Sequence, residues 1–143
     1  MDSDIYYAYV SSPSKKFPYS QRLQRLLIHD FAEKKGLKVT YYIAEIPAPG
    51  IFYNLEQKVL EGAKLKGFIT FSMKILFPFD KGETFLKKVL DGGYEMWFAE
   101  EDQVVKSKDD IEKIWLLEGI KRISDENEDR ANEFEEFCKS FLA

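Results

Sequence analysis

The sequence has one cysteine and one histidine, and this scarcity removes several kinds of site. Cys138 has no second cysteine for an intramolecular disulfide, and a zinc site built on several thiolates is excluded. His29 alone likewise excludes a metal site made of several histidines and leaves no spare histidine for a Ser-His-Asp triad. Because His29 lies inside a predicted helix, a structural role is favoured for it. We predict no metal site, and the sequence identifies no cofactor.

Long apolar runs and an excess of positive charge are also missing. No apolar run reaches the roughly 20 residues that a membrane-spanning helix needs, and the first ten residues lack the basic segment of a signal peptide. We therefore expect a cytoplasmic protein without a membrane partner. The 21 basic and 25 acidic residues give a net charge of -4, which disfavours nonspecific binding of polyanions. We accordingly expect no nucleic-acid partner.

Patterns typical of strands and helices alternate along the chain of 143 residues, of which 45% are hydrophobic. Strands are predicted at 5–10, 37–44, 68–71 and 94–99, with a short edge strand at 103–105. Helices are predicted between them and at 107–117, and the first helix is expected to bury Leu23, Leu26, Leu27, Phe31 and Ala32. This alternation predicts a single α/β domain at 1–123. Its sheet should be mostly parallel, with four or five strands and helices on both faces, as in resolvase-like or flavodoxin-like folds.

The last twenty residues have a different composition. Residues 124–143 are rich in acidic side chains, and Phe134, Phe137, Phe141 and Leu142 recur at helical spacing. This pattern predicts an acidic amphipathic C-terminal helix whose apolar face needs a partner. Packing on the same domain and packing on another subunit of a homo-oligomer both remain open.

The candidate functional residues follow the ends of the predicted strands. Carboxyl ends of parallel strands and amino ends of the following helices meet at one edge of a sheet, so we expect these residues to line one cleft. The predicted catalytic residues are Glu45, Ser12 and Glu100. The predicted ligand-binding residues are Ser11, Arg22, Tyr53, Asn54, Ser72 and Lys74.

Each chemical interpretation has a structural alternative. Glu45 and Glu100 fit an acid/base pair in which one carboxyl stays neutral, but one can simply cap a helix while the other is solvated. Ser11 or Ser12 fits a nucleophile or a phosphate ligand, although serines at such positions often serve only as helix caps. Basic side chains at this edge fit a phosphate clamp, yet the sequence contains no glycine-rich phosphate-binding fingerprint.

Several segments resemble the sporadic carbohydrate cluster family of small proteins. The resemblance covers roughly residues 4–121 and is carried by YYAYVSSP, QRLQRLLIHDFAEKKGL, AEIPAPGIFYNLEQ, GFITFSMKILFP and GYEMWFAEEDQVVKSKDDIEKI. Its most specific pieces are Glu45, Pro49-Gly50, Leu55-Glu56-Gln57 and Phe98 to Glu101. The resemblance implies a bacterial gene among genes for surface polysaccharides or modified sugars. It supplies no reaction.

A weaker similarity is to the catalytic domain of serine recombinases, in which a strand like IYYAYVSS is followed by a glutamine-bearing helix. Those enzymes surround their serine with several arginines, including one after the third strand. Here the third strand is followed by SMKILFPFD, and Arg22 and Arg25 are the only arginines in the first half of the chain. The similarity therefore implies the fold, whereas DNA strand exchange is not expected.

Three functions fit these observations. The first is carbohydrate biosynthesis on a sugar phosphate or nucleotide sugar, with Glu45 as acid/base, serines as hydrogen-bonding groups and Arg22 or Lys74 on a phosphate. The second is a noncatalytic subunit that docks a protein partner. The third is a protein that sequesters or senses a nucleotide-derived small molecule. The fold cannot separate these functions, because one architecture supports many activities.

Overall fold

A computed structural model of the chain describes residues 4–13, 18–45, 52–76, 82–114 and 116. The chain divides into two compact units, Met1–Ile111 and Glu112–Ala143. The predicted helix at 124–143 lies outside the described residues, so that helix and the boundary at 123 stay predictions. In the described part of the chain, no helix combines the length and apolar character that crossing a membrane requires.

The first unit is built on a five-stranded sheet with the order β2-β1-β3-β4-β5. Four strands run parallel, namely β1 (Ile5–Ser11), β2 (Lys38–Glu45), β3 (Gly67–Thr70) and β4 (Glu95–Phe98). The short edge strand β5 (Gln103–Val105) pairs antiparallel with β4. The predicted α/β class and the mostly parallel sheet are confirmed.

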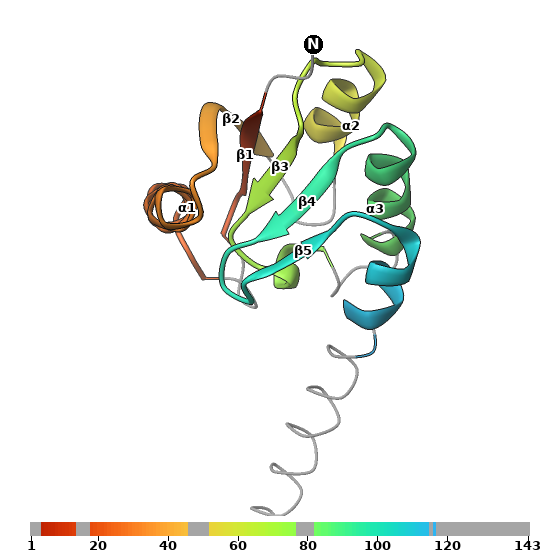
Figure 1. Cartoon of the computed structure of the whole chain (residues 1–143). Helices are drawn as coiled ribbons and strands as arrows, with labels where there is room; N and C mark the ends of the chain where they lie inside the picture. The colour runs from red at the N-terminus through yellow and green to blue at the C-terminus, as the bar shows by residue number, and fades with distance from the viewer. Residues whose placement is uncertain (1–3, 14–17, 46–51, 77–81, 115, 117–143) are drawn as a thin grey trace, which may run out of the picture. The chain divides into compact units, whose positions relative to one another are not determined.

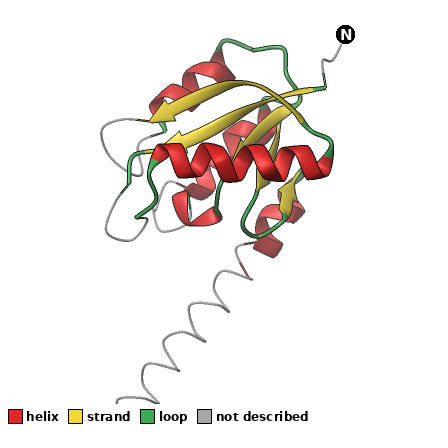
Figure 2. Cartoon of the chain, turned by 90° about the vertical axis from the view of Figure 1, so that its left-hand side faces the viewer, coloured by secondary structure: helices red, strands yellow, loops and turns green. Residues whose placement is uncertain are grey.

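Helices cover both faces of this sheet, as predicted (Figure 1). Helix α1 (Gln21–Lys35) lies across one face, in front of the strands in Figure 2. Helices α2 (Tyr53–Leu60) and α3 (Gly82–Asp91) lie on the other face and contact each other. A short 3₁₀ helix, η1 (Met73–Ile75), follows β3 directly. Residues 108–114 are also helical.

The predicted inward face of α1 is wrong for its three leucines, whereas Ala32 is buried as predicted. Leu23, Leu26 and Leu27 are 41%, 59% and 37% exposed, whereas the buried positions are Gln24, Ile28 and Ala32, spaced four residues apart. The leucine pattern misled the prediction because a glutamine is usually taken as a solvent-facing residue. Here Gln24 is fully buried, and its amide finds hydrogen-bond partners at the end of β1.

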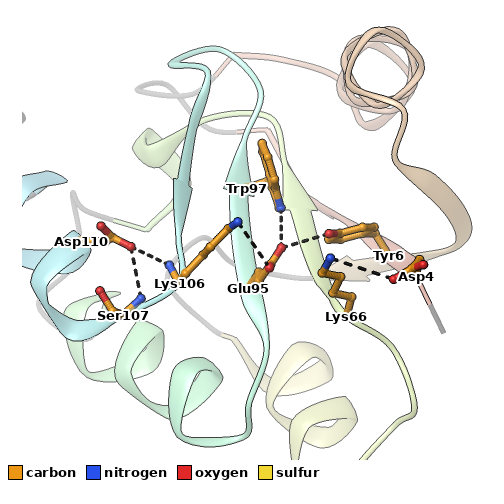
Figure 3. Close-up of polar contacts among 8 residues, drawn as sticks. All are labelled: Asp4, Tyr6, Lys66, Glu95, Trp97, Lys106, Ser107 and Asp110. Carbon is orange, nitrogen blue, oxygen red and sulfur yellow. Dashed lines mark hydrogen bonds and ion pairs between the residues drawn. The ribbon is translucent and has the colours of Figure 1, made fainter. Parts of the chain in front are cut away.

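A polar cluster ties the sheet together near its amino-terminal end (Figure 3). The Glu95 carboxylate accepts hydrogen bonds of 3.0 Å from both the Tyr6 hydroxyl and the Trp97 indole N–H, and the Lys106 ammonium lies 3.8 Å from it. Burial, followed by the bond to Glu95, raises the pKa of Tyr6 to about 12. Sequence reasoning did not single out Glu95. Its contacts join β1, β4 and the residue after β5, which makes it a structural link.

Candidate functional site

The carboxyl ends of β1 and β2 bring three of the predicted site residues together. Ser11 is the register partner of Glu45. The backbone N–H and the hydroxyl of Ser12 both donate to the Glu45 carbonyl oxygen, at 3.1 and 3.2 Å. The expected convergence of Ser11, Ser12 and Glu45 at one edge is therefore present. We refer below to these residues, together with Gln24, Ser72 and Glu101, as the strand-end cluster.

Gln24 fixes the backbone of Ser11 from both sides. Its side-chain oxygen accepts from the Ser11 N–H at 3.0 Å, and its side-chain nitrogen donates to the Ser11 carbonyl at 2.8 Å. The same nitrogen donates to the Tyr19 carbonyl at 2.9 Å, so α1, the segment before it and β1 are locked together. Sequence reasoning missed Gln24 as a site residue. The available signal was the glutamine-bearing helix noted in the similarity to recombinases.

The Ser11 hydroxyl is poorly placed for attack on a ligand. The residue is only 5% exposed, and its hydroxyl donates to the Ser12 carbonyl at 3.4 Å, a long contact compared with typical O–H···O bonds. A nucleophilic serine needs a base to take its proton, and among the described residues no hydrogen bond joins this hydroxyl to a carboxylate, lysine or histidine.

Glu45 is buried at the start of α2. It is 2% exposed, and its carboxylate accepts from the Leu55 N–H at 3.1 Å. The Asn54 side chain donates to the Ala44 carbonyl at 2.7 Å and reinforces the same junction. Burial raises the pKa of Glu45, and hydrogen bonds from Leu55, Asn54 and Tyr9 partly oppose that shift. Burial and the neighbouring Glu45 also raise the pKa of Tyr9. These contacts match the structural alternative, in which Glu45 caps a helix.

A second carboxylate, Glu101, stabilises the turn that follows β3. It accepts from the Ser72 hydroxyl at 2.6 Å and from the Met73 N–H at 2.8 Å. The Ser72 oxygen in turn accepts from the Lys74 N–H at 3.2 Å. Burial raises the pKa of Glu101, against the effect of the Ser72 and Met73 hydrogen bonds. Ser72 is thus fully buried and engaged with protein groups.

Glu100 and Lys74 are engaged with each other. Their side chains form an ion pair of 3.6 Å, and each remains about one-third exposed. The predicted acid/base partner of Glu45 therefore has a lysine as its contact, while the neighbouring Glu101 is the less exposed of the two carboxylates. The Glu100 carboxylate partly neutralises the positive charge that Lys74 presents to a phosphate, as Glu61 does for Lys58 on α2.

Arg22 and Tyr53 project into solvent. Arg22 is exposed on the first turn of α1, and Tyr53 is 62% exposed on the first turn of α2. Sequence position brings both near the expected edge, but exposure leaves them without a defined pocket. The described residues also contain no group of three or more histidine, cysteine, aspartate or glutamate side chains arranged to hold a metal ion.

No family model matches this chain, and no curated protein matches it. Several solved structures do, among them the following two. One is the N-terminal catalytic domain of the TP901-1 integrase, with a TM-score of 0.59, 14% identity, and coverage of 85% of this chain and 98% of that one. The other is a resolvase family site-specific recombinase from Streptococcus pneumoniae, with a TM-score of 0.55, 15% identity, and coverage of 96% and 99%.

These neighbours correct three predictions. Both are recombination proteins, so the predicted role in carbohydrate biosynthesis is wrong, and the expected sugar-phosphate or nucleotide-sugar ligand is wrong with it. The alternatives of a sequestering protein or a docking subunit fall with that prediction. The expectation of no nucleic-acid partner also conflicts with the neighbours. The resemblance to the sporadic carbohydrate cluster family has no support from any family model.

At these identities the likeness establishes the fold alone. The chain has the α/β fold of resolvase-family catalytic domains.

Proposed function

We propose that this protein binds DNA through its resolvase-like domain and does not itself cut the strand. The observation that carries the proposal is the buried Gln24, which holds Ser11 at the carboxyl end of β1 within a resolvase-like fold. The solved structures with this fold are an integrase catalytic domain and a site-specific recombinase, which supports DNA as the partner. The surroundings of Ser11 argue against cleavage.

The charge distribution is compatible with a DNA partner once the two units are counted separately. Residues 1–111 contain 16 basic and 16 acidic side chains, whereas residues 112–143 contain 5 basic and 9 acidic ones. The net charge of -4 therefore comes entirely from the second unit. The argument from overall charge against nucleic acid fails because it averages a neutral domain with an acidic segment.

Strand cleavage by Ser11 would lack transition-state stabilisation from the described residues. Phosphoryl transfer depends on cations that neutralise the charge developing on the phosphate oxygens. Lys74, which follows the third strand, is paired with Glu100. Two further carboxyl groups lie at this edge, the buried Glu45 at the end of β2 and the partly buried Glu101 after β4. Carboxylates at this edge repel a phosphate, so we assign no cutting activity to the chain alone.

The test combines a binding assay with an assay for covalent adducts. Fluorescence anisotropy with labelled duplex and single-stranded oligonucleotides should show saturable binding that weakens as salt rises. Denaturing gels of the same mixtures should show no protein–DNA adduct, either for the natural protein or for Ser11→Ala. Absence of binding at low salt would refute the DNA partner. An adduct that Ser11→Ala abolishes would refute the noncutting part.

Two finer predictions belong to this proposal. A cytoplasmic location fits a protein whose partner is DNA, and fractionation of cells that express the tagged protein would test it.

Kinship with the sporadic carbohydrate cluster family is supported only by the quoted segments, including Glu45 and Leu55-Glu56-Gln57. A structure of a member of that family should show an acidic side chain bound to the next helix, as Glu45 is bound to the Leu55 N–H.

A further inference from the structure

The outer edge of β2 is an exposed surface that the strand-end cluster does not use. Within the part of the chain that the structure describes, β2 is the first strand in the sheet order and pairs only with β1. Tyr41 and Tyr42, adjacent on this strand, are 52% and 36% exposed. Large aromatic side chains are among the residues most enriched where proteins contact partners. Two neighbouring ones on an open edge therefore need an explanation.

The two tyrosines lie on opposite sides of the strand, since successive side chains alternate, and each has a cation beside its ring. The Lys58 ammonium is 5.5 Å from the centre of the Tyr41 ring, which also contacts Tyr7 at 5.2 Å. The Arg25 guanidinium is 5.2 Å from the centre of the Tyr42 ring. Lys58 comes from α2 and Arg25 from α1, so both layers of helices supply a positive charge to this edge.

A hollow of about 360 Å³ extends from the strand to α2. Tyr41 and Tyr42 from β2 and Asn54, Gln57 and Lys58 from α2 are among the residues that line it, and so is Glu61, which pairs with Lys58. The Asn54 side chain donates to the Ala44 carbonyl, so Gln57 supplies the carboxamide that suits the edges of nucleic-acid bases. Arg25 lies beside the Tyr42 ring, on the α1 side of the strand. We call the set Arg25, Tyr41, Tyr42, Asn54, Gln57 and Lys58 the β2 edge surface.

We propose that the β2 edge surface binds single-stranded DNA. Bases without a pairing partner stack on exposed aromatic rings whatever their sequence, while nearby cations contact the phosphates. This inference rests on the proposed function and names the part of the domain that contacts DNA.

Addition of a protein strand to this edge is less compatible with its geometry. The register between β1 and β2 shifts after Tyr6, where Val39 is followed by an extra residue, Thr40, before pairing resumes at Tyr41. Such a bulge bends the strand and disrupts the regular ladder that a new strand requires. A flexible single strand of DNA needs no such ladder.

The experiment measures anisotropy of labelled oligothymidylate and of a duplex of equal length. Replacing both rings, in Tyr41→Ala with Tyr42→Ala, should weaken oligothymidylate binding by at least about fivefold for each ring. The matched double change to phenylalanine should retain the natural affinity, because stacking uses the ring and not the hydroxyl. Leu60→Ala is the control for loss of a large exposed apolar side chain elsewhere. Melting temperatures of all variants identify any loss through unfolding.

The charged residues provide a second, independent readout. With two cations on phosphates, log affinity should fall with log salt with a slope of about −1.4 for a single strand. Arg25→Ala or Lys58→Ala should halve that slope, whereas Lys87→Ala, which removes an exposed lysine on α3, should not. Glu61 pairs with Lys58 at 3.5 Å, so Glu61→Gln should release the lysine and tighten binding.

The outcomes separate this inference from the proposed function. If the natural protein binds DNA but the tyrosine and cation variants bind equally well, the β2 edge surface is refuted while DNA binding stands. Binding of duplex without binding of oligothymidylate also refutes the surface and leaves DNA binding intact. If neither DNA is bound, both proposals fall. Sedimentation could instead show that the natural protein is a dimer and that the tyrosine variants are monomers. The β2 edge surface would then bind a second copy of the chain, and the inference would be overturned.

Discussion

The strand-end cluster and the β2 edge surface differ in what their polar groups contact. In the strand-end cluster the side chains of Gln24, Glu45 and Ser72 are buried, and each is hydrogen-bonded to other protein groups. At the β2 edge surface the Tyr41 and Tyr42 rings are open to solvent, with basic side chains beside them. The strand-end cluster contains residue types that often act in catalysis, but their polar groups are hydrogen-bonded within the protein. The β2 edge surface contains residue types that seldom act in catalysis, but part of their side-chain surface is accessible to a partner.

This difference separates residues that hold the fold from residues that meet a partner. A buried polar group without a partner costs about 1–3 kcal/mol, so satisfied groups such as those of the strand-end cluster contribute mainly to stability. An exposed aromatic ring contributes little to stability and retains most of its area for binding. Changes in the first region should therefore reduce the free energy of unfolding, and changes in the second should reduce affinity.

The largest effect is expected for Gln24→Leu. Leucine is close to glutamine in volume but leaves the Ser11 N–H, the Ser11 carbonyl and the Tyr19 carbonyl without their present partner. At about 1 kcal/mol or more for each unsatisfied group, we expect a loss of about 3 kcal/mol in the free energy of unfolding. Urea unfolding followed by circular dichroism measures it.

The matched control lies on the exposed side of the same helix. Leu26 is 59% exposed, so Leu26→Gln should change the free energy of unfolding by less than about 0.5 kcal/mol. Equal losses of unfolding free energy from both variants would show that the Gln24 hydrogen bonds do not stabilise the protein. The buried and exposed sides of α1 would then not differ in their contribution to stability.

A smaller, pH-dependent effect is expected for Glu45→Gln. Burial raises the folded-state pKa of Glu45 above its ordinary value of 4.5, so the folded state favours the protonated carboxyl. The stability that this adds is fully present below pH 4.5 and is lost as pH rises through the folded-state pKa. Glutamine resembles the protonated form at every pH. The natural protein should therefore lose stability relative to the variant as pH rises from about 4 to 7.

Urea unfolding of both proteins at several pH values gives this difference directly. Glu101→Gln should behave with the same sign, because burial also raises the pKa of Glu101. If the natural protein instead gained stability over the Glu45→Gln variant as pH rose, hydrogen bonds to the carboxylate would outweigh its desolvation. Glu45 would then be a charged helix cap.

The sheet was predictable from sequence because its strands are short apolar segments bounded by turn residues. Phe68 to Phe71 and Tyr94 to Ala99 are examples, and they correspond to β3 and β4. Which residues of α1 face inward was not predictable from leucine spacing. Gln24 is buried because of hydrogen bonds to residues 5 and 13 positions away, and periodicity carries no information about such partners.

The site was predictable in location but not in detail. The ends of the predicted strands correctly grouped Ser11, Ser12 and Glu45. Which of Glu100 and Glu101 contacts Ser72 depends on the turn that follows β4, and the sequence did not predict that turn. In this turn Asp102 has a φ of 51°, which lies in the left-handed region that few residues other than glycine, asparagine and aspartate adopt. No pattern in the sequence predicted this conformation. The β2 edge surface was missed because Tyr41 and Tyr42 sit in a strand pattern, where aromatic residues are usually assigned to the core.

Among changes within the two compared regions, the smallest effect on stability is expected for Tyr42→Ala. The ring is partly exposed, and an exposed cation–π contact such as that with Arg25 adds only about 0.5–1 kcal/mol. The loss in unfolding free energy should thus stay near 1 kcal/mol, about a third of the loss for Gln24→Leu, and Tyr42→Phe should recover most of it. Urea unfolding under the same conditions makes the comparison. A loss as large as that of Gln24→Leu would make Tyr42 part of the structural framework, and weakened DNA binding by its variants would then report unfolding. A small loss accompanied by weakened binding would place the ring at the DNA, because only contact with the ligand changes affinity without changing the fold.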